Sequence, residues 1–284
     1  MNRVALFCCA VVLAAVHPVV SQQPAPTAVP PFKIAGNLYY VGTSDPTAFL
    51  FTTQAGHILI DTTYPETAPL VANSIRSLGF RLEEVKIILS SHAHFDHVGG
   101  HAAMKKLTGA QVVATAEDAV NLESGGAKAF HVIGSFAPVT VDRRLKDGET
   151  VQLGATMLTA HLLPGHTEGN TAWTAAVEEN GRRYSVLIAP SMSINPGVKL
   201  VGNPKWAGVG DAYAASFKRL RAMGGEIFLA PHAAFFDLVA KRQKQQHSAA
   251  NPADAFVDPK GYASFVDDLE KKYLAQLQRE RTGR

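Results

Sequence analysis

Cysteine is nearly absent from this sequence, because Cys8 and Cys9 are the only two among 284 residues and both lie close to the start. A disulfide-stapled scaffold would contain many more. An excess of one charge is also lacking, since 27 Lys and Arg face 24 Asp and Glu and no long basic block precedes the C-terminal region. This balance gives no indication of nucleic-acid binding. The composition also differs from that of an intrinsically disordered chain, because 46% of the residues are hydrophobic.

Long hydrophobic runs are missing after residue 30, so no later segment is expected to insert into a membrane. The apolar run over residues 4–16 follows Arg3 and is too short for a transmembrane helix, which needs about 20 residues. It is typical of a secretory signal peptide ending at Ser21. A buried N-terminal helix or a lipid-anchored form is the weaker alternative. We therefore expect residues 1–21 to be removed, which leaves a mature chain without any thiol.

A linker rich in Pro and Gln, residues 22–31, follows the signal peptide, and residues 32–284 are expected to form a single domain. Periodicity of apolar residues predicts strands over 38–41, 47–53, 56–61, 85–90, 111–115, 150–153, 156–163, 170–177, 183–189 and 226–230. It predicts helices over 66–78 and 100–107 and helices starting near residues 116, 211 and 261, with Asp211 as an N-cap. This order indicates one mixed α/β domain.

Metal-ligating side chains are concentrated directly after the predicted strand 85–90. The segment 91–100 reads SHAHFDHVGG and supplies four candidate ligands, His92, His94, Asp96 and His97. Gly99 and Gly100 would let the backbone pack closely where the next helix begins. Burying so many imidazole and carboxylate groups together would be costly without a cation. The cluster therefore predicts a metal site, built from His and Asp because the mature chain has no cysteine.

Two further histidines occupy comparable positions, His166 in a turn between two strands and His232 just after the strand 226–230. His101 falls on a helix and His161 inside a strand, so both are expected to be structural. The isolated histidines are also expected to be structural: His17, His57, His131 and His247. The remaining five histidines and one aspartate are too many for one tetrahedral zinc and suit two metal ions.

The motif HAHFDH, followed downstream by GHT and PH, resembles the metallo-β-lactamase superfamily. The resemblance runs from about Phe32 to the last predicted helix, which is nearly the whole mature chain. It implies an α/β fold, the four-layer αβ/βα sandwich, in which two mixed sheets are flanked by helices and the metals lie at one edge.

The third subclass of β-lactamases within this superfamily is the most similar. Glyoxalase-, phosphodiesterase- and many lactonase-type members carry a bridging Asp where this chain has Pro190 and Ser191. Di-iron members have Glu where His94 stands, the first β-lactamase subclass uses a cysteine ligand, and the second has Asn in place of His92. Further similarity to the third subclass lies in the segments PFKIAGNLYYVGT, GHTEGNTAWT and GNPKW.

This resemblance implies the role of each site residue. One zinc would be bound by His92, His94 and His166, and a second by Asp96, His97 and His232. The substrate carboxylate would contact Ser191 and Ser193. Val198 is a departure, because some members have at that position a Tyr implicated in stabilising the developing oxyanion.

The implied reaction is hydrolysis of the β-lactam amide by a metal-bound hydroxide, which Asp96 orients, without a covalent intermediate. The enzyme would confer antibiotic resistance from the bacterial periplasm or as a secreted protein. Its partner would be a small β-lactam molecule, with no nucleic acid and no membrane insertion of the mature chain, and we expect a monomer. The alternatives are an exported metal-dependent lactonase or other hydrolase of the same fold, and a zinc-binding protein without catalysis.

A glycine-containing loop over 125–138 carries the apolar residues Phe130, Ile133 and Phe136. These side chains would either form an apolar wall over the substrate or pack onto their own domain. The sequence leaves both interpretations open.

Overall fold

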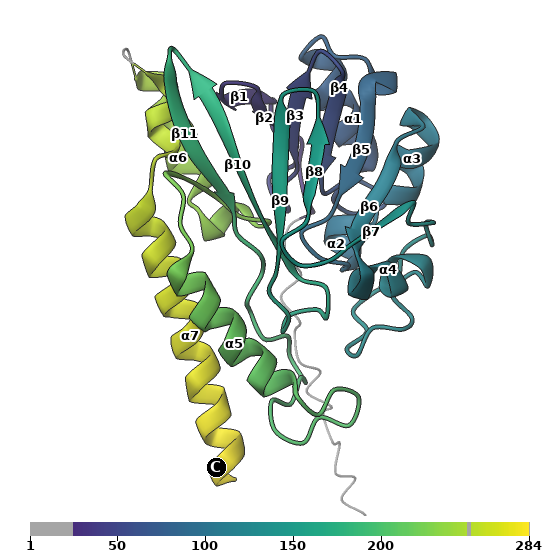
Figure 1. The fold of residues 1–284 in the computed structure, drawn as a ribbon, viewed down its shortest axis with the longest axis vertical. Coiled ribbons are helices and arrows are strands. Elements are labelled where there is room, and N and C mark those ends of the chain that lie inside the picture. The colour runs from purple at the N-terminus through teal and green to yellow at the C-terminus, as the bar shows by residue number, and fades with distance from the viewer. Residues whose placement is uncertain (1–24, 249–250, 284) are drawn as a thin grey trace, which may run out of the picture.

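The structure is a computed structural model that describes residues 25–248 and 251–283. The predicted signal peptide, both cysteines and His17 lie outside the described residues. Two mixed β-sheets pack face to face with helices on their outer sides (Figure 1). This is the predicted αβ/βα sandwich. Within the described ranges, no helix combines the length and apolar character needed to cross a bilayer.

The first sheet contains seven strands that lie side by side in chain order. They are β1 (Phe32–Ala35), β2 (Leu38–Tyr40), β3 (Phe49–Thr53), β4 (Gly56–Ile60), β5 (Val85–Leu89), β6 (Gln111–Thr115) and β7 (Arg143–Leu145). Neighbouring strands from β1 to β4 are antiparallel, whereas those from β4 to β7 are parallel. The carboxyl ends of β4, β5 and β6 therefore meet at one edge of the sheet.

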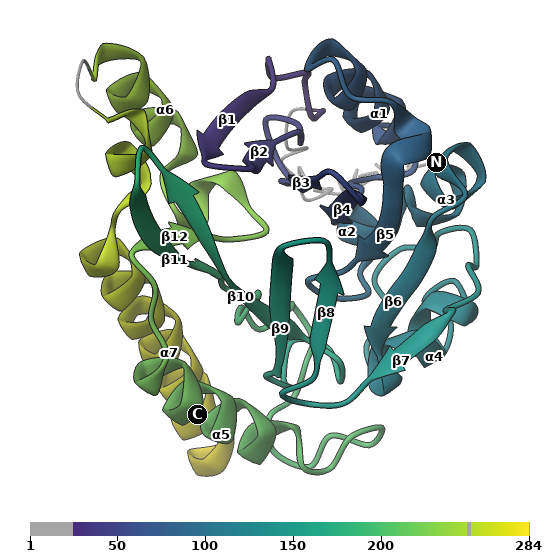
Figure 2. The same cartoon turned by 45° about the horizontal axis from the view of Figure 1, so that its top comes forward.

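The second sheet contains five strands in the order β12-β11-β10-β9-β8. They are β8 (Thr150–Leu153), β9 (Thr156–Leu162), β10 (Thr171–Glu179), β11 (Arg182–Ile188) and β12 (Ile227–Leu229). Only β11 and β12 are parallel. The two sheets and their outer helices are separated most clearly in Figure 2.

Seven α-helices and three short 3₁₀ helices are present among the described residues. The α-helices are α1 (Ala68–Ser77), α2 (Phe95–Val98), α3 (His101–Thr108), α4 (Ala116–Glu123), α5 (Val209–Ala222), α6 (Leu238–His247) and α7 (Pro259–Thr282). The 3₁₀ helices are η1 (Leu82–Glu84), η2 (Ala233–Phe235) and η3 (Pro252–Phe256).

Two apolar clusters hold the layers together. The smaller cluster joins the first sheet to α1, α3 and α4, and the larger one fills the space between the sheets and extends under α5 and α7. The Trp173 side chain belongs to the larger cluster and is 1% exposed. Its indole N–H donates a hydrogen bond to the carbonyl of Ser90 at 2.9 Å. The second sheet is thus fixed to the end of β5, where the predicted metal loop begins.

Most predicted elements are present, and the differences have local causes. The strand predicted from Thr47 starts at Phe49, because Thr47 instead donates its backbone N–H to Pro231 of the second sheet's last loop. The prediction that Asp211 caps its helix was wrong: α5 is capped by Gly208, and Asp211 lies in the first turn. The linker is not detached throughout, since Ala28 forms a β-bridge with Thr43.

Candidate metal centre

The predicted metal loop lies between β5 and the one-turn helix α2. His92 and His94 are on the loop, while Asp96 and His97 are on α2. Gly99 is needed for this tight turn, because a Cβ there would lie 2.3 Å from both the Phe95 carbonyl oxygen and Pro65. The close approach of the following helix to the sheet therefore depends on glycine, as the sequence predicted.

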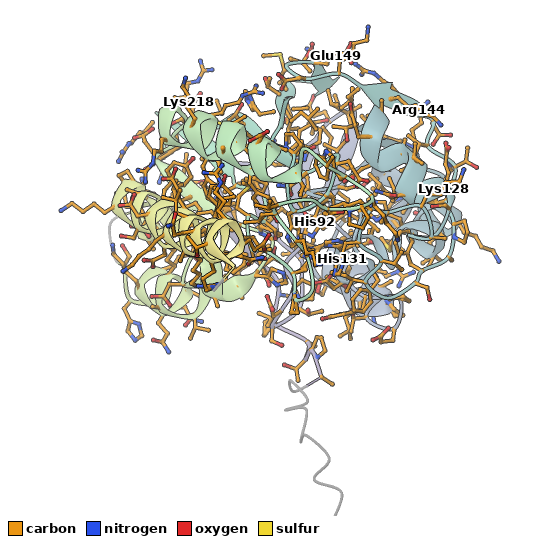
Figure 3. All side chains as sticks on the ribbon, turned by 90° about the horizontal axis from the view of Figure 1, so that it is seen from below. His92, Lys128, His131, Arg144, Glu149 and Lys218 are labelled. Atoms are coloured by element: carbon orange, nitrogen blue, oxygen red, sulfur yellow. The ribbon has the colours of Figure 1, made fainter. Side chains whose placement is uncertain are left out.

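The other two predicted ligands reach the same edge from the second sheet. His166 lies on the connection between β9 and β10, and His232 follows β12. Figure 3 looks at this end of the molecule and shows His92 near its middle. Segments separated by up to 140 positions, from His92 to His232, are therefore brought together.

His92, His94 and His166 form the first cluster, with ligand atoms all within 4.8 Å of one another. The Nδ1 atom of His94 lies 3.0 Å from Nε2 of His166. The Nδ1–H of His166 donates to the carbonyl of Ser193 at 2.7 Å, which leaves its Nε2 lone pair facing the cluster. The Nε2 atom of His92 is buried and has no hydrogen-bond partner among the described residues.

Asp96, His97 and His232 form the second cluster. The Nε2 atom of His97 lies 3.2 Å from both Nε2 of His232 and Oδ2 of Asp96, and the latter two atoms are 3.7 Å apart. Carboxylates lie behind both imidazoles. The Nδ1 atom of His97 is 3.4 Å from Asp61, and that of His232 is 3.0 Å from Asp45.

These spacings fit zinc. At zinc–nitrogen distances of about 2.0–2.1 Å, tetrahedral geometry places ligand atoms about 3.3 Å apart. The closest atom pairs of the two clusters, at 3.0 and 3.2 Å, approach that separation. The Nε2 atom of His92, buried and without a hydrogen-bond partner among the described residues, is likewise able to bind a cation. The six residues predicted from the sequence are therefore assembled as two three-residue clusters suited to metal ions.

The electrostatics of the first cluster favour cation binding. Burial, together with the neighbouring imidazoles, holds the pKa values of His92 and His94 well below the usual histidine range. Burial also lowers the pKa of His166 to about 4. All three imidazoles are consequently neutral at pH 7, and neutral imidazole is the form that binds metal.

The second cluster contains an ionised carboxylate. Burial alone would raise the pKa of Asp96, but the His97 imidazole outweighs it and holds that pKa well below the usual aspartate range. Burial similarly would lower the pKa of His97, yet the Asp96 and Asp61 carboxylates raise it to about 10. Asp96 is therefore ionised at neutral pH and could offer a charged oxygen atom to a cation.

The predicted substrate-binding serines support the site through their backbone. The Ser191 carbonyl accepts a hydrogen bond from Asn170 at 2.7 Å, and the Ser193 carbonyl accepts from Tyr213 at 2.9 Å in addition to His166. The Ser191 residue is 0% exposed, and its hydroxyl has no partner among the described residues. Contact of either hydroxyl with a substrate stays a prediction.

Histidines expected to be structural do lie outside the two clusters. His101 is buried, with its ring nitrogens 2.7 Å from the Thr62 hydroxyl and 3.1 Å from the Ser90 hydroxyl. The Nε2 atom of His161 lies 2.8 Å from the Thr174 hydroxyl on the neighbouring strand. Each ring therefore has a local hydrogen-bond partner.

The apolar loop packs onto its own domain. Phe130 is 8% exposed, and its ring centroid lies 4.9 Å from that of Trp206. Phe136 is also 8% exposed and belongs to the smaller apolar cluster. An apolar wall formed by these two aromatic rings is therefore not supported.

Sequence reasoning missed three supporting carboxylates, of which Asp45 and Asp61 are described above. Asp61 follows β4 and accepts hydrogen bonds from the N–H and the hydroxyl of Ser91, both at 2.7 Å. The sequence signal for Asp61 is a polar residue directly after a buried strand, because the carboxyl ends of neighbouring parallel strands lie at the same sheet edge.

The third missed carboxylate, Asp118 of α4, joins the two histidine loops. It accepts from the N–H groups of Ala93 at 2.8 Å and Gly169 at 3.0 Å. Burial raises its pKa to about 7, against these hydrogen bonds, which lower it. Asp118 therefore fixes the His92–His94 loop against the His166 loop.

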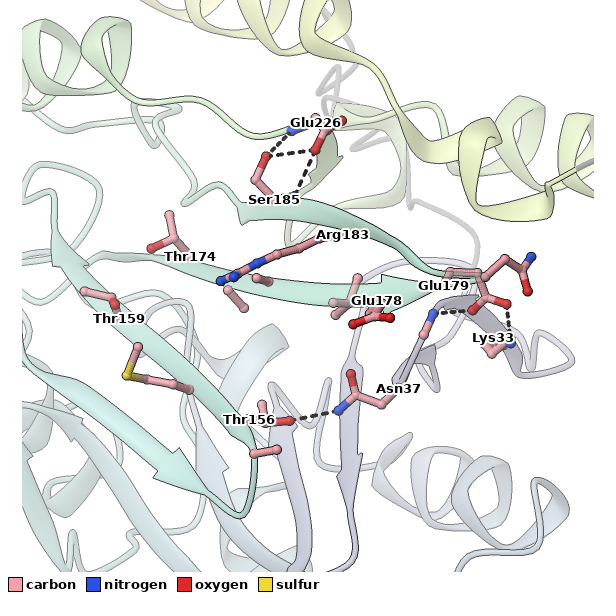
Figure 4. A pocket seen from close by; sticks show the side chains of 17 residues that line it. Lys33, Asn37, Thr156, Thr159, Thr174, Glu178, Glu179, Arg183, Ser185 and Glu226 are labelled. Carbon is pink, nitrogen blue, oxygen red and sulfur yellow. Dashed lines mark hydrogen bonds and ion pairs between the residues drawn. The ribbon is translucent and has the colours of Figure 1, made fainter.

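The positions of two hollows can be compared with that of the candidate metal centre. One, of 1130 Å³, lies along β9, β10 and β11 and contains none of the six residues (Figure 4). A smaller one of 330 Å³ is lined by Ser193, Phe235 and residues of α7. The smaller hollow also contains none of the six residues, but Phe235, which lines it, has its ring centroid 5.0 Å from that of His232.

The family model of the metallo-beta-lactamase superfamily matches residues 41–173. Among solved structures, the native FEZ-1 metallo-beta-lactamase from Legionella gormanii is 41% identical, with a TM-score of 0.88, over 92% of this chain and 100% of that one. BJP-1, a subclass B3 metallo-beta-lactamase of Bradyrhizobium japonicum, is 36% identical, with a TM-score of 0.83, over 90% of this chain and 97% of that one.

Curated relatives match over a shorter segment. The hydroxyacylglutathione hydrolase of Methylococcus capsulatus is 33% identical over 109 residues, which are 38% of this chain and 35% of that protein. The chain thus spans about a third of the length of the curated relatives that it matches.

Proposed function

The chain belongs to the metallo-β-lactamase superfamily and is a hydrolase of that fold, and from this premise we propose that it hydrolyses the amide bond of β-lactam antibiotics with two zinc ions. The solved metallo-β-lactamases are similar along almost the whole chain, whereas the hydroxyacylglutathione hydrolases match a part of it.

The observation that carries the proposal is the ligand set. Among the described residues, the two clusters contain five histidines and a single carboxylate, Asp96. Glyoxalase-type relatives are expected to carry a second, bridging carboxylate after the strand that here ends at Ile188. This chain has Pro190 and the buried Ser191 at that place. The composition of the site therefore favours β-lactam over thioester hydrolysis.

Each cluster would hold one ion, the first through His92, His94 and His166 and the second through Asp96, His97 and His232. Zinc in such a site would lower the pKa of bound water to about 7 and polarise a carbonyl group. The ionised Asp96 carboxylate belongs to the second cluster and lies within 4.8 Å of a ring nitrogen of His92 in the first. It can accept a hydrogen bond from the attacking water and orient it toward the lactam carbonyl.

The substrate approaches from the side of the second cluster. Side-chain exposure is 24% for His232 and 17% for Asp96, whereas the His97 side chain is 0% exposed. Ser193, whose carbonyl accepts from His166, would donate its hydroxyl to the substrate carboxylate, and the 330 Å³ hollow that it lines would leave room for a substituent. No nucleophilic side chain is required, so no covalent acyl-enzyme forms.

Hydrolysis of another ester-like bond is the second candidate, and the curated hydroxyacylglutathione hydrolases favour it. A glutathione thioester or a lactone would present a carbonyl to the same two clusters. The single carboxylate in the ligand set is the feature that argues against it.

Export forms part of the proposal. The apolar run and the small residues before Gln22 would direct the protein to the periplasm or the medium, where it would meet antibiotics before they reach their targets. The intact mass of the exported protein tests this part: we expect a chain starting near Gln22, and a mass that retains residues 1–21 would contradict it.

Metal removal combined with one ligand variant tests the proposed function. Dialysis against a chelator should abolish β-lactam hydrolysis, and added zinc should restore it. His94→Ala should lower kcat/KM roughly 100-fold or more, because the first cluster loses a ligand. His161→Ala is the matched control and should keep both zinc and activity, since its ring contacts Thr174 away from the centre. Activity that survives chelation and the loss of His94 would contradict the mechanism.

A further inference from the structure

Asp45 contacts the back of the His232 imidazole. Its two carboxylate oxygens lie 3.0 and 3.2 Å from Nδ1 of His232, and one of them also accepts the backbone N–H of Ala233 at 2.8 Å. Asp45 lies on the loop between β2 and β3 of the first sheet, whereas His232 follows β12 of the second. The contact therefore crosses from one sheet to the other and joins residues 187 positions apart.

The loop that carries Asp45 is docked on the His232 segment by a second residue. The Thr47 N–H donates to the carbonyl of Pro231 at 3.0 Å, and the Thr47 hydroxyl donates to the carbonyl of Ala230 at 2.9 Å. Thr47 is fully buried. Two bonds that do not involve the imidazole thus dock the loop, and the one from the Thr47 backbone does not depend on the Thr47 side chain.

A carboxylate in this position determines which nitrogen of His232 carries the proton. It accepts a hydrogen bond from Nδ1–H, so the proton is held on Nδ1 and the lone pair of Nε2 faces Asp96 and His97. The carboxylate also fixes the rotation of the ring, and outer partners of this kind commonly change metal affinity by 10- to 100-fold.

The two clusters differ in the groups that lie behind their imidazole rings. In the first, the atoms behind His92 and His166 are neutral, namely the Ser91 hydroxyl at 3.1 Å and the Ser193 carbonyl at 2.7 Å. In the second, both histidines have a carboxylate behind them. The Asp45 side chain is 44% exposed, whereas the Asp61 side chain behind His97 is 2% exposed.

We propose that Asp45 is a positioning residue for the second zinc site, which orients His232 and sets the affinity of that site without contacting the metal or the substrate. The inference rests on the proposed function, because it assumes that Asp96, His97 and His232 hold a zinc ion. It predicts that losing the Asp45 carboxylate weakens the second site and leaves the first unchanged.

Zinc affinity of the full-length mature protein, measured by competition with a chromophoric chelator, tests this inference independently of any substrate. Wild type should bind two zinc ions per chain. Asp45→Ala should bind the first with wild-type affinity and the second 10- to 100-fold more weakly. Asp45→Asn keeps one oxygen acceptor without the charge, so its second-site affinity should fall between the two.

Thr47→Val is the matched control, because it removes one hydrogen bond that docks the same loop and leaves the Asp45–His232 contact in place. It should retain wild-type affinity at both sites. The proton on Nδ1 of His232, observed by NMR, should be protected in wild type and in Thr47→Val and exchange faster in Asp45→Ala.

Three outcomes would overturn the inference: wild-type second-site affinity in Asp45→Ala, equal weakening of both sites, or the same second-site loss in Thr47→Val. If wild type itself bound no second zinc, the proposed function would fail together with this inference. If every variant bound two zinc ions with wild-type affinity, only the proposed role of Asp45 would be contradicted, and the proposed function would stand.

Discussion

Buried hydrogen bonds behind the histidines decide how the candidate centre is arranged. His166 donates to the Ser193 carbonyl, and His232 to Asp45, so each presents its other nitrogen to its cluster. Asp61 holds Ser91 through two bonds of 2.7 Å and thereby fixes the residue that precedes His92. The ligands are therefore oriented before a metal binds, which reduces the cost of ordering them.

The hydroxyl of Ser191 provides one prediction. It is buried without a partner, so Ser191→Ala should cost little stability, because it removes an unsatisfied polar group. If both serines bind the substrate carboxylate, the Ser191→Ala/Ser193→Ala double variant should raise KM, with about 1.5–3 kcal/mol lost per well-formed bond and unchanged zinc content. Steady-state kinetics on a β-lactam and its carboxyl ester measure this. An equal loss on acid and ester would mean that the serines only shape the loop.

His101 gives a prediction about pH. Burial lowers its pKa to about 4, against an ordinary value of 6.5 in the unfolded chain. Between these values the unfolded state binds more protons, so the free energy of unfolding falls as the pH drops from 6.5 to 4, by up to about 3 kcal/mol from this residue. His101→Gln lacks this titration. Urea unfolding of both proteins in chelator should show a smaller loss in the variant over that interval, and parallel curves would contradict the assignment.

The helix α7 supports the loop that follows Ser193 through hydrogen bonds from its last turns. The Glu280 carboxylate accepts the N–H groups of Leu200 at 2.7 Å and Val201 at 2.8 Å. Gln276 of the same helix donates to the Val198 carbonyl at 2.8 Å. The end of α7 thus holds the segment that contains Val198.

Glu280→Ala should release this segment without disturbing the clusters. We expect KM to rise several-fold, stability to fall by about 1–3 kcal/mol, and zinc content to stay the same. Glu280→Gln, which keeps one acceptor, should be intermediate. Kinetics and zinc analysis on the same preparations provide the measurement. A parallel fall in zinc content would show that α7 supports the metal centre itself.

Most elements with a clear apolar period could be predicted from the sequence, including the short or edge strands β2, β8 and β12, whereas β1, β7 and α6 could not. β6 and the start of α4 were predicted to the residue, because Thr115 ends one and caps the other. β1 and β7 are short strands at the two edges of the first sheet, and their pairing depends on neighbours and not on a period. The helix α6 was missed because its sequence is mostly polar.

The six candidate ligands could be predicted because their spacing is a local signal, concentrated in the segment 91–100 and two strand ends. Asp45 and Asp118 could not, because each is a single aspartate whose contact lies far along the chain, at His232 for one and at Gly169 for the other. The local sequence around such a residue contains no sign of its partner. Only the fold shows which carboxylates support the histidines.

In the whole molecule, the candidate centre depends on both sheets. The first sheet carries His92, His94, Asp96 and His97, and the second carries His166 and His232. Three sets of hydrogen bonds hold the two sheets in a fixed relative position: the Trp173–Ser90 bond, the Thr47 bonds to the 230–231 segment, and the Asp118 bonds to the two histidine loops. Relative movement of the sheets would separate the residues within each cluster. Metal binding and the packing of the sheets should therefore stabilise each other.

The most direct test of the central claim compares kcat/KM of the zinc-loaded protein on three substrates: a β-lactam with a free carboxylate, a lactone and a hydroxyacylglutathione thioester. Zinc content is measured on the same preparation. The proposed function predicts two zinc ions per chain, β-lactam turnover that a chelator abolishes, and a clear preference for the β-lactam over the other two. Efficient hydrolysis of the thioester or lactone by the same two-zinc protein, with no β-lactam turnover, would contradict it.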